Sequence, residues 1–295
     1  MFTAKSRTSH SWCAKHRFDY TEIIIKVRID KVMTRTQIDK IKLPSSEIIR
    51  LDNGLAMTSD TELEKWRAET LFSKEPETIA WIDHYSKNGG FFYDVGANIG
   101  GYSLYAAYTN RDLSVYSFEP VTNNYLTLLR NKELNKLSNL IPFQLALSSA
   151  SKLDTIYISD DRIGNSGAQV SAPINEHGQR FKPLAKEILL CLRLDSMVDE
   201  YNFPIPSFMK IDVDGHELDI LGGAMKTLTS PELASILIEC NGDESMKKIS
   251  LILSDKGFIP DDAFNKIPNH SSNRRRNNTE NVATNVVYSR GRKYL

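Results

Sequence analysis

Cysteine is scarce in this chain, and the few cysteines present are not paired. The 295 residues include three, Cys13, Cys191 and Cys240, and no two of them have a C-x-x-C spacing. An odd number without that spacing predicts neither a disulfide framework nor a zinc site built on cysteine. We therefore expect a reducing compartment.

Long apolar runs are missing as well. The longest run near the start is Ile23-Ile24-Ile25, which is too short for the core of a signal peptide. No window approaches the roughly eighteen uncharged apolar residues that a transmembrane helix needs. The sequence therefore predicts a soluble, cytoplasmic protein without a transmembrane segment.

The chain has no excess of either charge, since 37 Lys and Arg balance 37 Asp and Glu. The balance is uneven, because residues 1–50 hold eleven basic and five acidic side chains and Arg274-Arg275-Arg276 is basic too. Solvated ends are the favoured interpretation, with binding to nucleic acid or to an anionic membrane as the alternative. No basic stripe crosses the centre of the chain, so a nucleic-acid partner is not favoured.

The chain does contain a regular alternation of strand and helix patterns after the break at Gly89-Gly90. Strands are predicted at 91–95, 113–118, 141–146, 208–213, 236–240, 257–259 and 284–289. Helices are predicted at 101–108, 123–135 and 217–228. This alternation is typical of a Rossmann-like α/β fold, with a seven-stranded, mostly parallel sheet and helices on both faces.

The region before this alternation is predicted to be an extension. β-Prone residues flank the turn sequence Asp52-Asn53-Gly54, which predicts a hairpin. We divide the chain into an N-terminal extension over residues 1–60 and an α/β domain over residues 61–295. Within the domain, residues 153–158 alternate like an additional edge strand, and residues 159–187 are predicted to form a loop insertion near the site.

The first two predicted strands end in residues that suit a nucleoside cofactor. The first runs into Asp94-Val95-Gly96-Ala97-Asn98-Ile99-Gly100, where glycines let the backbone turn sharply into a helix and approach a ligand. The second ends in Phe118-Glu119-Pro120, where the carboxylate of Glu119 can accept hydrogen bonds from ribose hydroxyls. Together they predict a cofactor at the carboxyl ends of the strands.

Nicotinamide and S-adenosylmethionine cofactors both fit a glycine loop and a ribose-binding acid, but the charges favour the second. A nicotinamide-binding loop has the pattern G-x-G-x-x-G, and Asn98 stands where its middle glycine makes room for pyrophosphate. Asp94 would repel a diphosphate, whereas it suits the ammonium group of a methionine moiety. The sequence therefore predicts S-adenosylmethionine.

The predicted cofactor-binding residues come from the ends of four strands and the start of the first helix. They are Asp94, Gly96, Ala97, Asn98, Gly100, Ser103, Glu119, Pro120, Ala146, Leu147 and Asp212. Ala146 and Leu147, where the third strand ends, suit a wall beside an adenine ring, although a simple loop explains them equally well.

The fourth strand leads into the densest group of ionisable residues in the chain, Asp212-Val213-Asp214-Gly215-His216-Glu217. Methyl transfer to a hydroxyl needs a base that takes its proton, and the imidazole of His216, with an ordinary pKa near ~6.5, is a candidate. Asp212 is the second catalytic candidate, because it could orient the acceptor or share the role of base. A structural alternative is that Asp214 caps the following helix and Glu217 completes a capping box.

The fifth strand ends in Glu239-Cys240-Asn241, which places a carboxylate and an amide in the next crevice along the sheet. With Asp212 or Asp214, these groups could hold a divalent cation through oxygen ligands. Substrate positioning is the favoured interpretation, so we assign no metal-binding residues.

In combination, these motifs resemble the FkbM family of methyltransferases over residues 70–260. The motifs are, in order, Lys74-Glu75-Pro76-Glu77-Thr78 with Trp81, Tyr93 to Gly100 with Tyr102-Ser103, Phe118-Glu119-Pro120, Ala146-Leu147-Ser148, Leu194-Asp195, Lys210 to Glu217, and Ile238-Glu239. The resemblance implies a class I methyltransferase fold and S-adenosylmethionine-dependent O-methylation of a sugar, a polysaccharide component or a natural product. It also implies that Asp94, Gly96 and Glu119 contact the cofactor and that residues 212–217 border a small-molecule or carbohydrate acceptor.

Two other functions are weighed against this one. A nucleic-acid methyltransferase, acting on RNA, would account for the basic ends, but Asp212-Val213-Asp214-Gly215 is unlike the Asn/Asp-Pro-Pro-aromatic segment typical of base methylation. Ribose methylation typically uses a lysine after the fifth strand, where Glu239-Cys240-Asn241 stands. A non-catalytic S-adenosylmethionine-binding module is the third, and the intact acidic and glycine positions argue against it. The sequence predicts neither the identity of the acceptor nor an oligomeric state.

Overall fold

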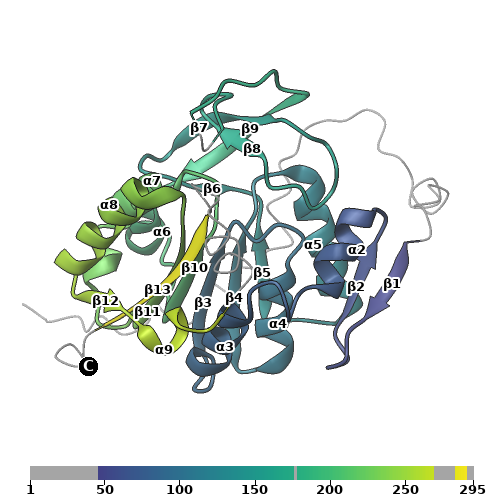
Figure 1. The fold of residues 1–295 in the computed structure, drawn as a ribbon, viewed down its shortest axis with the longest axis horizontal. Coiled ribbons are helices and arrows are strands. Elements are labelled where there is room, and N and C mark those ends of the chain that lie inside the picture. The colour runs from purple at the N-terminus through teal and green to yellow at the C-terminus, as the bar shows by residue number, and fades with distance from the viewer. Residues whose placement is uncertain (1–45, 176–177, 269–282, 291–295) are drawn as a thin grey trace, which may run out of the picture. The chain divides into compact units, whose positions relative to one another are not determined.

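The seven predicted strands form one sheet in the computed structural model, which describes residues 46–175, 178–268 and 283–290. The order is β12-β13-β11-β10-β3-β4-β5 (Figure 1). The strands are β3 (Gly90–Val95), β4 (Leu113–Phe118), β5 (Leu140–Phe143), β10 (Phe208–Ile211), β11 (Ser235–Cys240), β12 (Phe258–Pro260) and β13 (Thr284–Arg290). The five strands from β11 to β5 are parallel, and β13 is antiparallel to both of its neighbours. The predicted seven-stranded, mostly parallel sheet is confirmed.

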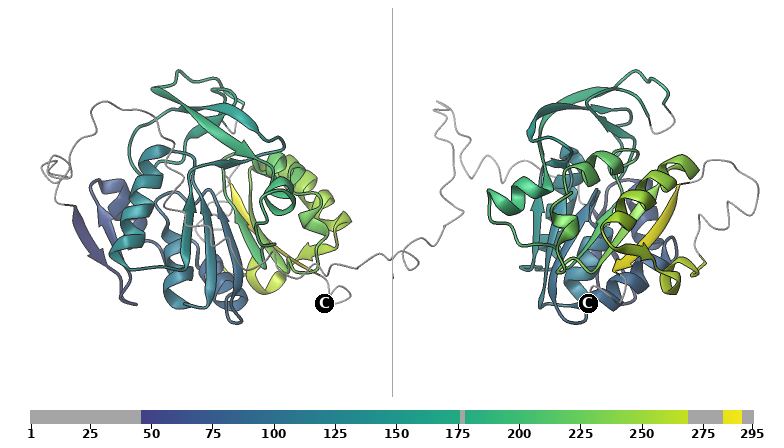
Figure 2. Two further views of the ribbon diagram at one scale, coloured as in Figure 1. Left: turned by 180° about the vertical axis from the view of Figure 1, so that it is seen from behind. Right: turned by 90° about the vertical axis from the view of Figure 1, so that its left-hand side faces the viewer.

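Helices cover both faces of the sheet (Figure 2). On one face lie α3 (Pro76–Tyr85), α4 (Gly101–Thr109), α5 (Thr122–Leu134) and α9 (Asp262–Asn265), and on the other lie α6 (Leu194–Asp199), α7 (Glu217–Gly222) and α8 (Gly242–Asp255). Each face has its own cluster of buried apolar side chains. The α4 face includes Leu104 and Leu128, and the α7 face includes Ile220 and Leu253.

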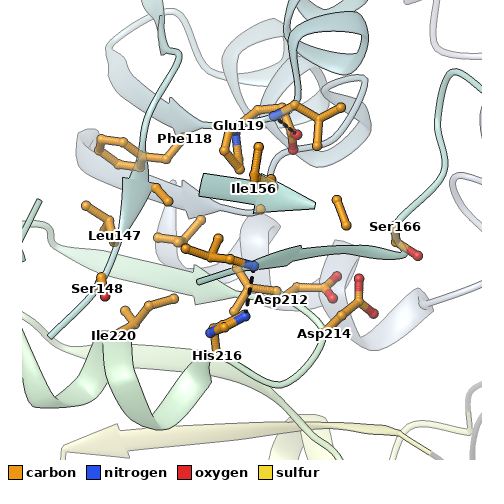
Figure 3. Close-up of a pocket in the computed structure, with 18 of the residues that line it drawn as sticks. Phe118, Glu119, Leu147, Ser148, Ile156, Ser166, Asp212, Asp214, His216 and Ile220 are labelled. Carbon is orange, nitrogen blue, oxygen red and sulfur yellow. Dashed lines mark hydrogen bonds between the residues drawn. The ribbon is translucent and has the colours of Figure 1, made fainter. Parts of the chain in front are cut away.

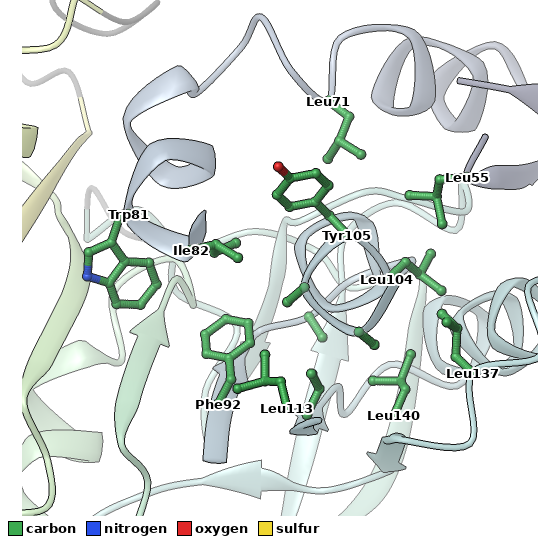
Figure 4. Close-up of a cluster of buried hydrophobic side chains, with 14 of the residues drawn as sticks. Leu55, Leu71, Trp81, Ile82, Phe92, Leu104, Tyr105, Leu113, Leu137 and Leu140 are labelled. Atoms are coloured by element: carbon green, nitrogen blue, oxygen red, sulfur yellow. The ribbon is translucent and has the colours of Figure 1, made fainter. Parts of the chain in front are cut away.

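Side chains of the central strands alternate between these two clusters. On β3, Phe92 packs against Trp81 of α3 and against Phe208 of β10, whereas Tyr93 and Val95 face the opposite cluster. The rings of Phe92 and Phe208 stack with their centroids 4.7 Å apart. Figure 4 shows the cluster on the α4 face, with Trp81 and Phe92 at one side of it. Because both faces are buried, the strands are apolar nearly throughout, as is typical of parallel sheets.

A second, four-stranded sheet lies at the carboxyl ends of the parallel strands (Figures 1 and 2). Its strands, in spatial order, are β6 (Ala146–Leu147), β9 (Ala185–Leu192), β7 (Lys152–Ile158) and β8 (Ala168–Val170). The predicted edge strand is β7, whereas β8 lies in the segment predicted to be a loop. The sequence does not predict β9, because this strand has apolar residues on both faces and so lacks the alternation of apolar and polar residues. Leu189 and Cys191 are buried, whereas Ile188 and Leu190 are exposed.

Three predicted elements differ from the structure by more than one residue at an end. β10 ends at Ile211, the strand predicted at 141–146 is divided between β5 and β6, and the helix predicted at 217–228 ends at Gly222 before a 3-10 turn at Thr227–Thr229. Two consecutive glycines weaken the helix where it ends. They also allow a close contact, since a Cβ atom on Gly223 would lie 2.0 Å from the carbonyl oxygen of Ser148.

The predicted hairpin is confirmed. β1 (Glu47–Arg50) pairs antiparallel with β2 (Ala56–Ser59), and helix α2 (Glu62–Glu69) follows. Leu55 and Met57 are fully buried in the cluster of the α4 face. The hairpin thus packs on the sheet as part of the compact unit that begins at Ser46. The basic residues before it, and Arg274-Arg275-Arg276, lie outside the described part of the chain.

Asn131 of α5 joins the hairpin to the loop that follows β3. Its fully buried side chain accepts hydrogen bonds from the N–H (2.7 Å) and the hydroxyl (2.9 Å) of Thr58. It also donates one to the carbonyl of Ile99, at 3.1 Å. A side-chain amide can satisfy buried donors and acceptors together, which an apolar side chain cannot do.

We expect Asn131→Ala to lower the free energy of unfolding by about 2–4 kcal/mol, because it leaves the N–H of Thr58 and the carbonyl of Ile99 buried without partners. Asn123→Ala is the matched control, since Asn123 is exposed on the same helix, and its effect should stay within about 0.5 kcal/mol. Urea denaturation followed by circular dichroism measures both. Equal losses in the two variants would contradict this role of Asn131.

The loop after β3 turns at Gly96, where φ is +83°. A Cβ atom at this position would lie 1.9 Å from the carbonyl oxygen of Asp212. Glycine is therefore required both by the positive φ and by the contact with the end of β10. The space that this glycine leaves is filled by the protein's own backbone.

We expect Gly96→Ala to lower the free energy of unfolding by about 3 kcal/mol or more, because the positive φ and the backbone contact both oppose a side chain. Gly178→Ala separates the two causes. Gly178 also has a positive φ, +76°, but no atom lies within 4 Å of an added Cβ, so we expect a loss of only about 1–2 kcal/mol. Denaturation midpoints compare them, and the same loss in both variants would show that the contact with Asp212 is without consequence.

Candidate active site

A cavity of about 240 Å³ opens at the carboxyl ends of β3, β4, β10 and β11. Phe118 and Glu119 line one side of it, and Asp212 and His216 line the other (Figure 3). The small, four-stranded sheet contributes Ile156 of β7 to the lining of this cavity. The cavity lies where the chain leaves β3 for a helix on one face and β10 for a helix on the other, which is the place where doubly wound sheets bind ligands.

A smaller cavity adjoins the first and shares its wall. Gly96, Asn98 and Asp212 line both cavities, and so do two cations, Arg67 of α2 and Lys74. The two cavities therefore adjoin at the glycine loop, one bordered by Glu119 and the other by Asp94.

Glu119 is held by the backbone of two loops. Its carboxylate accepts hydrogen bonds from the N–H of Asn98 (2.8 Å) and from the N–H of Val121 (2.9 Å). Burial raises its pKa to about 7, although these backbone bonds and Arg67 act in the opposite direction. Two carboxylate oxygens offer about four acceptor sites, so Glu119 keeps acceptor capacity toward the cavity that it lines.

Asp94 stands at the end of β3 with one oxygen satisfied and one not. Oδ2 accepts a hydrogen bond from the hydroxyl of Ser103 at 2.5 Å, and that hydroxyl accepts one from Ser117 at 2.6 Å. Oδ1 is buried without a hydrogen-bond partner among the described residues. Burial raises the pKa of Asp94, whereas Lys210 lowers it. An unsatisfied buried carboxylate oxygen beside a cavity is a good acceptor for a ligand that carries hydrogen-bond donors.

Lys210 lies buried among carboxylates at the end of β10. Its ammonium donates to Asp212 Oδ2 at 2.6 Å, and Asp94 and Glu75 also hold its pKa above the ordinary value, although burial acts to lower it. Burial acts to raise the pKa of Asp212, but Lys210, Lys74 and Arg67 together lower it. Asp212 is therefore ionised at neutral pH.

The loop between β10 and α7 does not adopt the predicted capping arrangement. The N-cap position of α7 is His216, not Asp214, and Asp214 has a left-handed φ of +51°. Glu217 is buried and accepts a hydrogen bond from the N–H of Gly215, at 3.1 Å. His216 Nε2 accepts one from the N–H of Val170 on β8, at 3.3 Å, so this loop is tied to the small sheet.

Glu239 lies at the end of β11, next to the end of β10. Ile238 is the register partner of Ile211. Glu239 and Asp212 are the next residues on the two neighbouring strands, so they lie side by side where β10 ends. Glu239 lines the large cavity. Burial raises its pKa to about 9, with further contributions from Asp212, Asp214 and Glu217.

Most of the predicted site residues meet at these two cavities. The large cavity is lined by Gly96, Asn98, Glu119, Pro120, Ala146, Leu147, Asp212 and His216, and the small one by Asp94 and Ala97 in addition to the shared residues. Gly100 and Ser103 line neither of them. Ser103 contacts Asp94 instead, and at Gly100 a Cβ atom would lie 2.3 Å from Leu128, so its glycine serves packing.

Sequence patterns miss several residues of the site. Arg67 comes from helix α2, and its Nε donates to the carbonyl of Gly164 at 2.5 Å. Ile156 of β7, and Asn165 and Val170 of the insertion, also line the large cavity. The expectation that the insertion lies near the site is confirmed. Nothing in its sequence indicates which side chains face inward, because the inward set depends on how β7, β8 and β9 pair.

Two further findings concern metals and membranes. Within residues 46–175, 178–268 and 283–290, no group of three or more His, Cys, Asp or Glu side chains is placed to hold a metal ion. None of the helices in these ranges combines the length and the apolar character needed to cross a bilayer.

The chain is similar to methyltransferases of known name. The hexuronic acid methyltransferase AglP of Haloferax volcanii is 26% identical over 192 residues, which are 65% of this chain and 72% of that protein. The methyltransferase sdnD of Sordaria araneosa is 27% identical over 190 residues, 57% of this chain and 73% of that protein.

Solved structures of methyltransferases resemble this chain more distantly. The METTL16 methyltransferase domain has a TM-score of 0.44 and 12% identity over 82% of this chain and 86% of that one. The precorrin-6y C5,15-methyltransferase of Geobacter metallireducens has a TM-score of 0.42 and 12% identity over 75% and 89%.

A sequence profile described as the methyltransferase FkbM domain matches residues 94–260, which is more than half of the 295 residues. The match runs from Asp94, at the end of β3, to the end of β12, and so includes both cavities' strand ends. The chain therefore belongs to the FkbM family of methyltransferases.

Proposed function

We propose that the protein uses S-adenosylmethionine to methylate a hydroxyl group of a sugar, a polysaccharide component or a natural product. The name of the Haloferax relative specifies a hexuronic acid, which supports a carbohydrate acceptor for this chain too. The observation that carries the proposal is the pair of carboxylates at the ends of β3 and β4. Asp94 and Glu119 border two adjoining cavities that share the glycine loop as a wall.

The residues present fit the polar groups of the cofactor. Asp94 Oδ1 is a buried acceptor in need of a donor, and the ammonium of a methionine moiety is such a donor. Arg67 and Lys74 line the same small cavity and offer cations to the carboxylate of that moiety. Glu119 keeps free acceptor sites for ribose hydroxyls.

The apolar part of the large cavity suits an adenine ring. Phe118 and Leu147 line it from the large and the small sheet, and Ile156 lies over it from β7 (Figure 3). Ala146 and Pro120 complete this wall with small side chains. A flat heterocycle buried among such groups gains from removing apolar surface from water.

At the other end of the large cavity, the ionisable side chains of Asp212 and His216 would border the acceptor. Asp212 is ionised and can accept a hydrogen bond from a hydroxyl, which holds the acceptor in one orientation. His216 borders the same space from the start of α7. When bound, the cofactor supplies an electrophilic methyl group on a positively charged sulfur, and the acidic surroundings favour that charge.

Asp94→Asn tests the cofactor half of the proposal. We expect the affinity for S-adenosylhomocysteine to fall about 10- to 100-fold, the loss of one charge-assisted hydrogen bond, as measured by isothermal titration calorimetry. The free energy of unfolding should not fall, because burial disfavours the ionised form of Asp94 and Ser103 can still donate to the remaining oxygen.

Asp112→Asn is the matched control for this experiment. It makes the same chemical change at an exposed position, between α4 and β4, and should leave the affinity unaltered. Unchanged affinity in Asp94→Asn would remove Asp94 from the cofactor site.

The reaction itself is tested with purified protein, methyl-labelled S-adenosylmethionine and a panel of sugars that includes hexuronic acids. Because the proposed product is a methyl ether, we expect label in the sugar that survives mild alkaline hydrolysis. A hexuronic acid also carries a carboxyl group, and its methyl ester would lose the label under the same conditions. Release of all of the label would show that the carboxyl group of the sugar is methylated and not a hydroxyl group. Binding of S-adenosylhomocysteine without transfer to any acceptor would favour a non-catalytic module.

A further inference from the structure

Transfer of a methyl group to a hydroxyl requires a base, and the side chains at the acceptor end of the large cavity are not equally able to serve. A hydroxyl oxygen attacks more readily when its proton is removed as the new bond forms. Such a base must face the cavity, must have a free lone pair and must gain affinity for a proton from its surroundings. These three requirements separate His216, Asp212 and Glu239.

His216 has its available lone pair engaged. Nε2 accepts the N–H of Val170, so in this arrangement the proton of the neutral imidazole is on Nδ1. Nδ1 faces Asp219, at 3.7 Å from its Oδ2. His216 therefore connects α7 to the small sheet, and to take a proton at Nε2 it would have to give up the bond to Val170.

Asp212 is a weak base for a different reason. The ammonium of Lys210 lies 2.6 Å from its Oδ2, and the side chain of this lysine is 1% exposed, whereas that of Asp212 is 27% exposed. A carboxylate held by such a cation keeps its charge rather than binding a proton. Asp212 is suited to accept a hydrogen bond from the acceptor, and not to remove its proton.

Glu239 meets all three requirements. It lines the large cavity. Within the described ranges, no hydrogen bond or ion pair to its side-chain carboxylate is found. Its neighbours on β10, the following loop and α7 are Asp212, Asp214 and Glu217, all acidic, and Lys210 is the cation that acts against them. This crowding of negative charge, with burial, favours the binding of a proton.

The other elements around Glu239 do not neutralise it. Its register partner on β13 is Asn285, a neutral amide that donates to Glu77 of α3 at 3.3 Å. On α8, which starts at Gly242, Asp243 and Glu244 are exposed. The side chains of these two residues are acidic as well, so neither they nor Asn285 bring a cation to Glu239.

We propose that Glu239 is the catalytic base that takes the proton of the acceptor hydroxyl, an inference that rests on the proposed hydroxyl methylation. The Glu239 carboxylate accepts the proton while the acceptor oxygen forms a bond to the methyl carbon. The bond from that carbon to sulfur breaks, and its electron pair stays on the sulfur. The products are a methyl ether, S-adenosylhomocysteine and protonated Glu239, which then releases its proton to solvent.

The charge of the methyl donor connects this base to the reaction. Without ligands, burial and three carboxylates raise the pKa of Glu239 to about 9, so the proton is retained at neutral pH. A sulfonium group in the same cavity stabilises the ionised carboxylate and lowers that pKa. Glu239 thus becomes an available base when the methyl donor is bound, and it recovers its proton affinity once a neutral thioether remains.

Glu239→Gln is the decisive variant. We expect kcat to fall about 100-fold or more at neutral pH, the usual contribution of a positioned base. Affinity for S-adenosylhomocysteine should change less than about threefold. Its sulfur is uncharged, so it interacts almost equally with a glutamate and with a glutamine at position 239. Asp243→Asn is the matched control: an exposed carboxylate becomes an amide near the same strand end, and kcat should be unchanged.

The pH profile distinguishes a base from a structural or donating role. For the wild type, kcat should rise with pH along a limb that is absent in Glu239→Gln. In Asp212→Asn that limb should move to lower pH, because a negative neighbour is lost and Lys210 is released from its partner. If Glu239 instead donates a hydrogen bond as a neutral acid, kcat falls as pH rises and the glutamine variant, which also donates, stays active.

Wild-type turnover keeps the two proposals separate. If the wild type transfers methyl groups and Glu239→Gln retains more than about a tenth of kcat with an unaltered pH limb, Glu239 is not the base and the methyltransferase proposal stands. If the wild type methylates no hydroxyl, the proposed function fails first.

Discussion

One buried ammonium group allows the acidic strand ends of this protein to meet. Lys210 lies beneath the junction of β3 and β10, donates to Asp212 at 2.6 Å and interacts with Asp94 and Glu75. Without that cation, three carboxylates would face one another in a region of low dielectric, where like charges repel strongly. With it, Asp212 stays ionised and the backbone of the same residue can pack against Gly96. The position of the glycine loop depends on this contact.

This cation does not offset the effect of burial at the neighbouring strands of the cleft. Glu119 and Glu239 stand on the strands outside the β3 and β10 pair, and burial raises the pKa of each, to about 7 and about 9. The two differ in what surrounds them. Glu119 is supported by backbone N–H groups, which favour a fixed hydrogen-bonding role, whereas Glu239 is surrounded by other acids, which favours exchange of a proton. In the proposed reaction, the positively charged methyl donor would interact favourably with both carboxylates.

The sequence predicts the large sheet and the strand ends that line the cavities well, because both follow from the backbone. Parallel strands buried on two faces are nearly continuous apolar runs, and their ends must carry the polar residues that face the cleft, as Asp94 and Glu119 do. The reason for the glycines was predicted only in part. Gly96 and Gly100 do turn the chain, but the backbone of Asp212 and the side chain of Leu128 occupy the space beside them. Contacts between distant segments of this kind have no local pattern.

The rest of the cavity lining could not be predicted to the same depth, because it comes from an insertion and from a helix that precedes the sheet. β9 has apolar residues on both faces, Arg67 lies on α2 some thirty residues before Gly96, and the partner of His216 is the backbone of Val170. None of these positions has a fixed offset from a motif. In the proposed function, the strand ends hold the methyl donor, and they lie within the residues that the family profile matches. The small sheet lines part of the rest of the large cavity, so the shape that would select an acceptor depends on the part of the chain with the weakest local pattern.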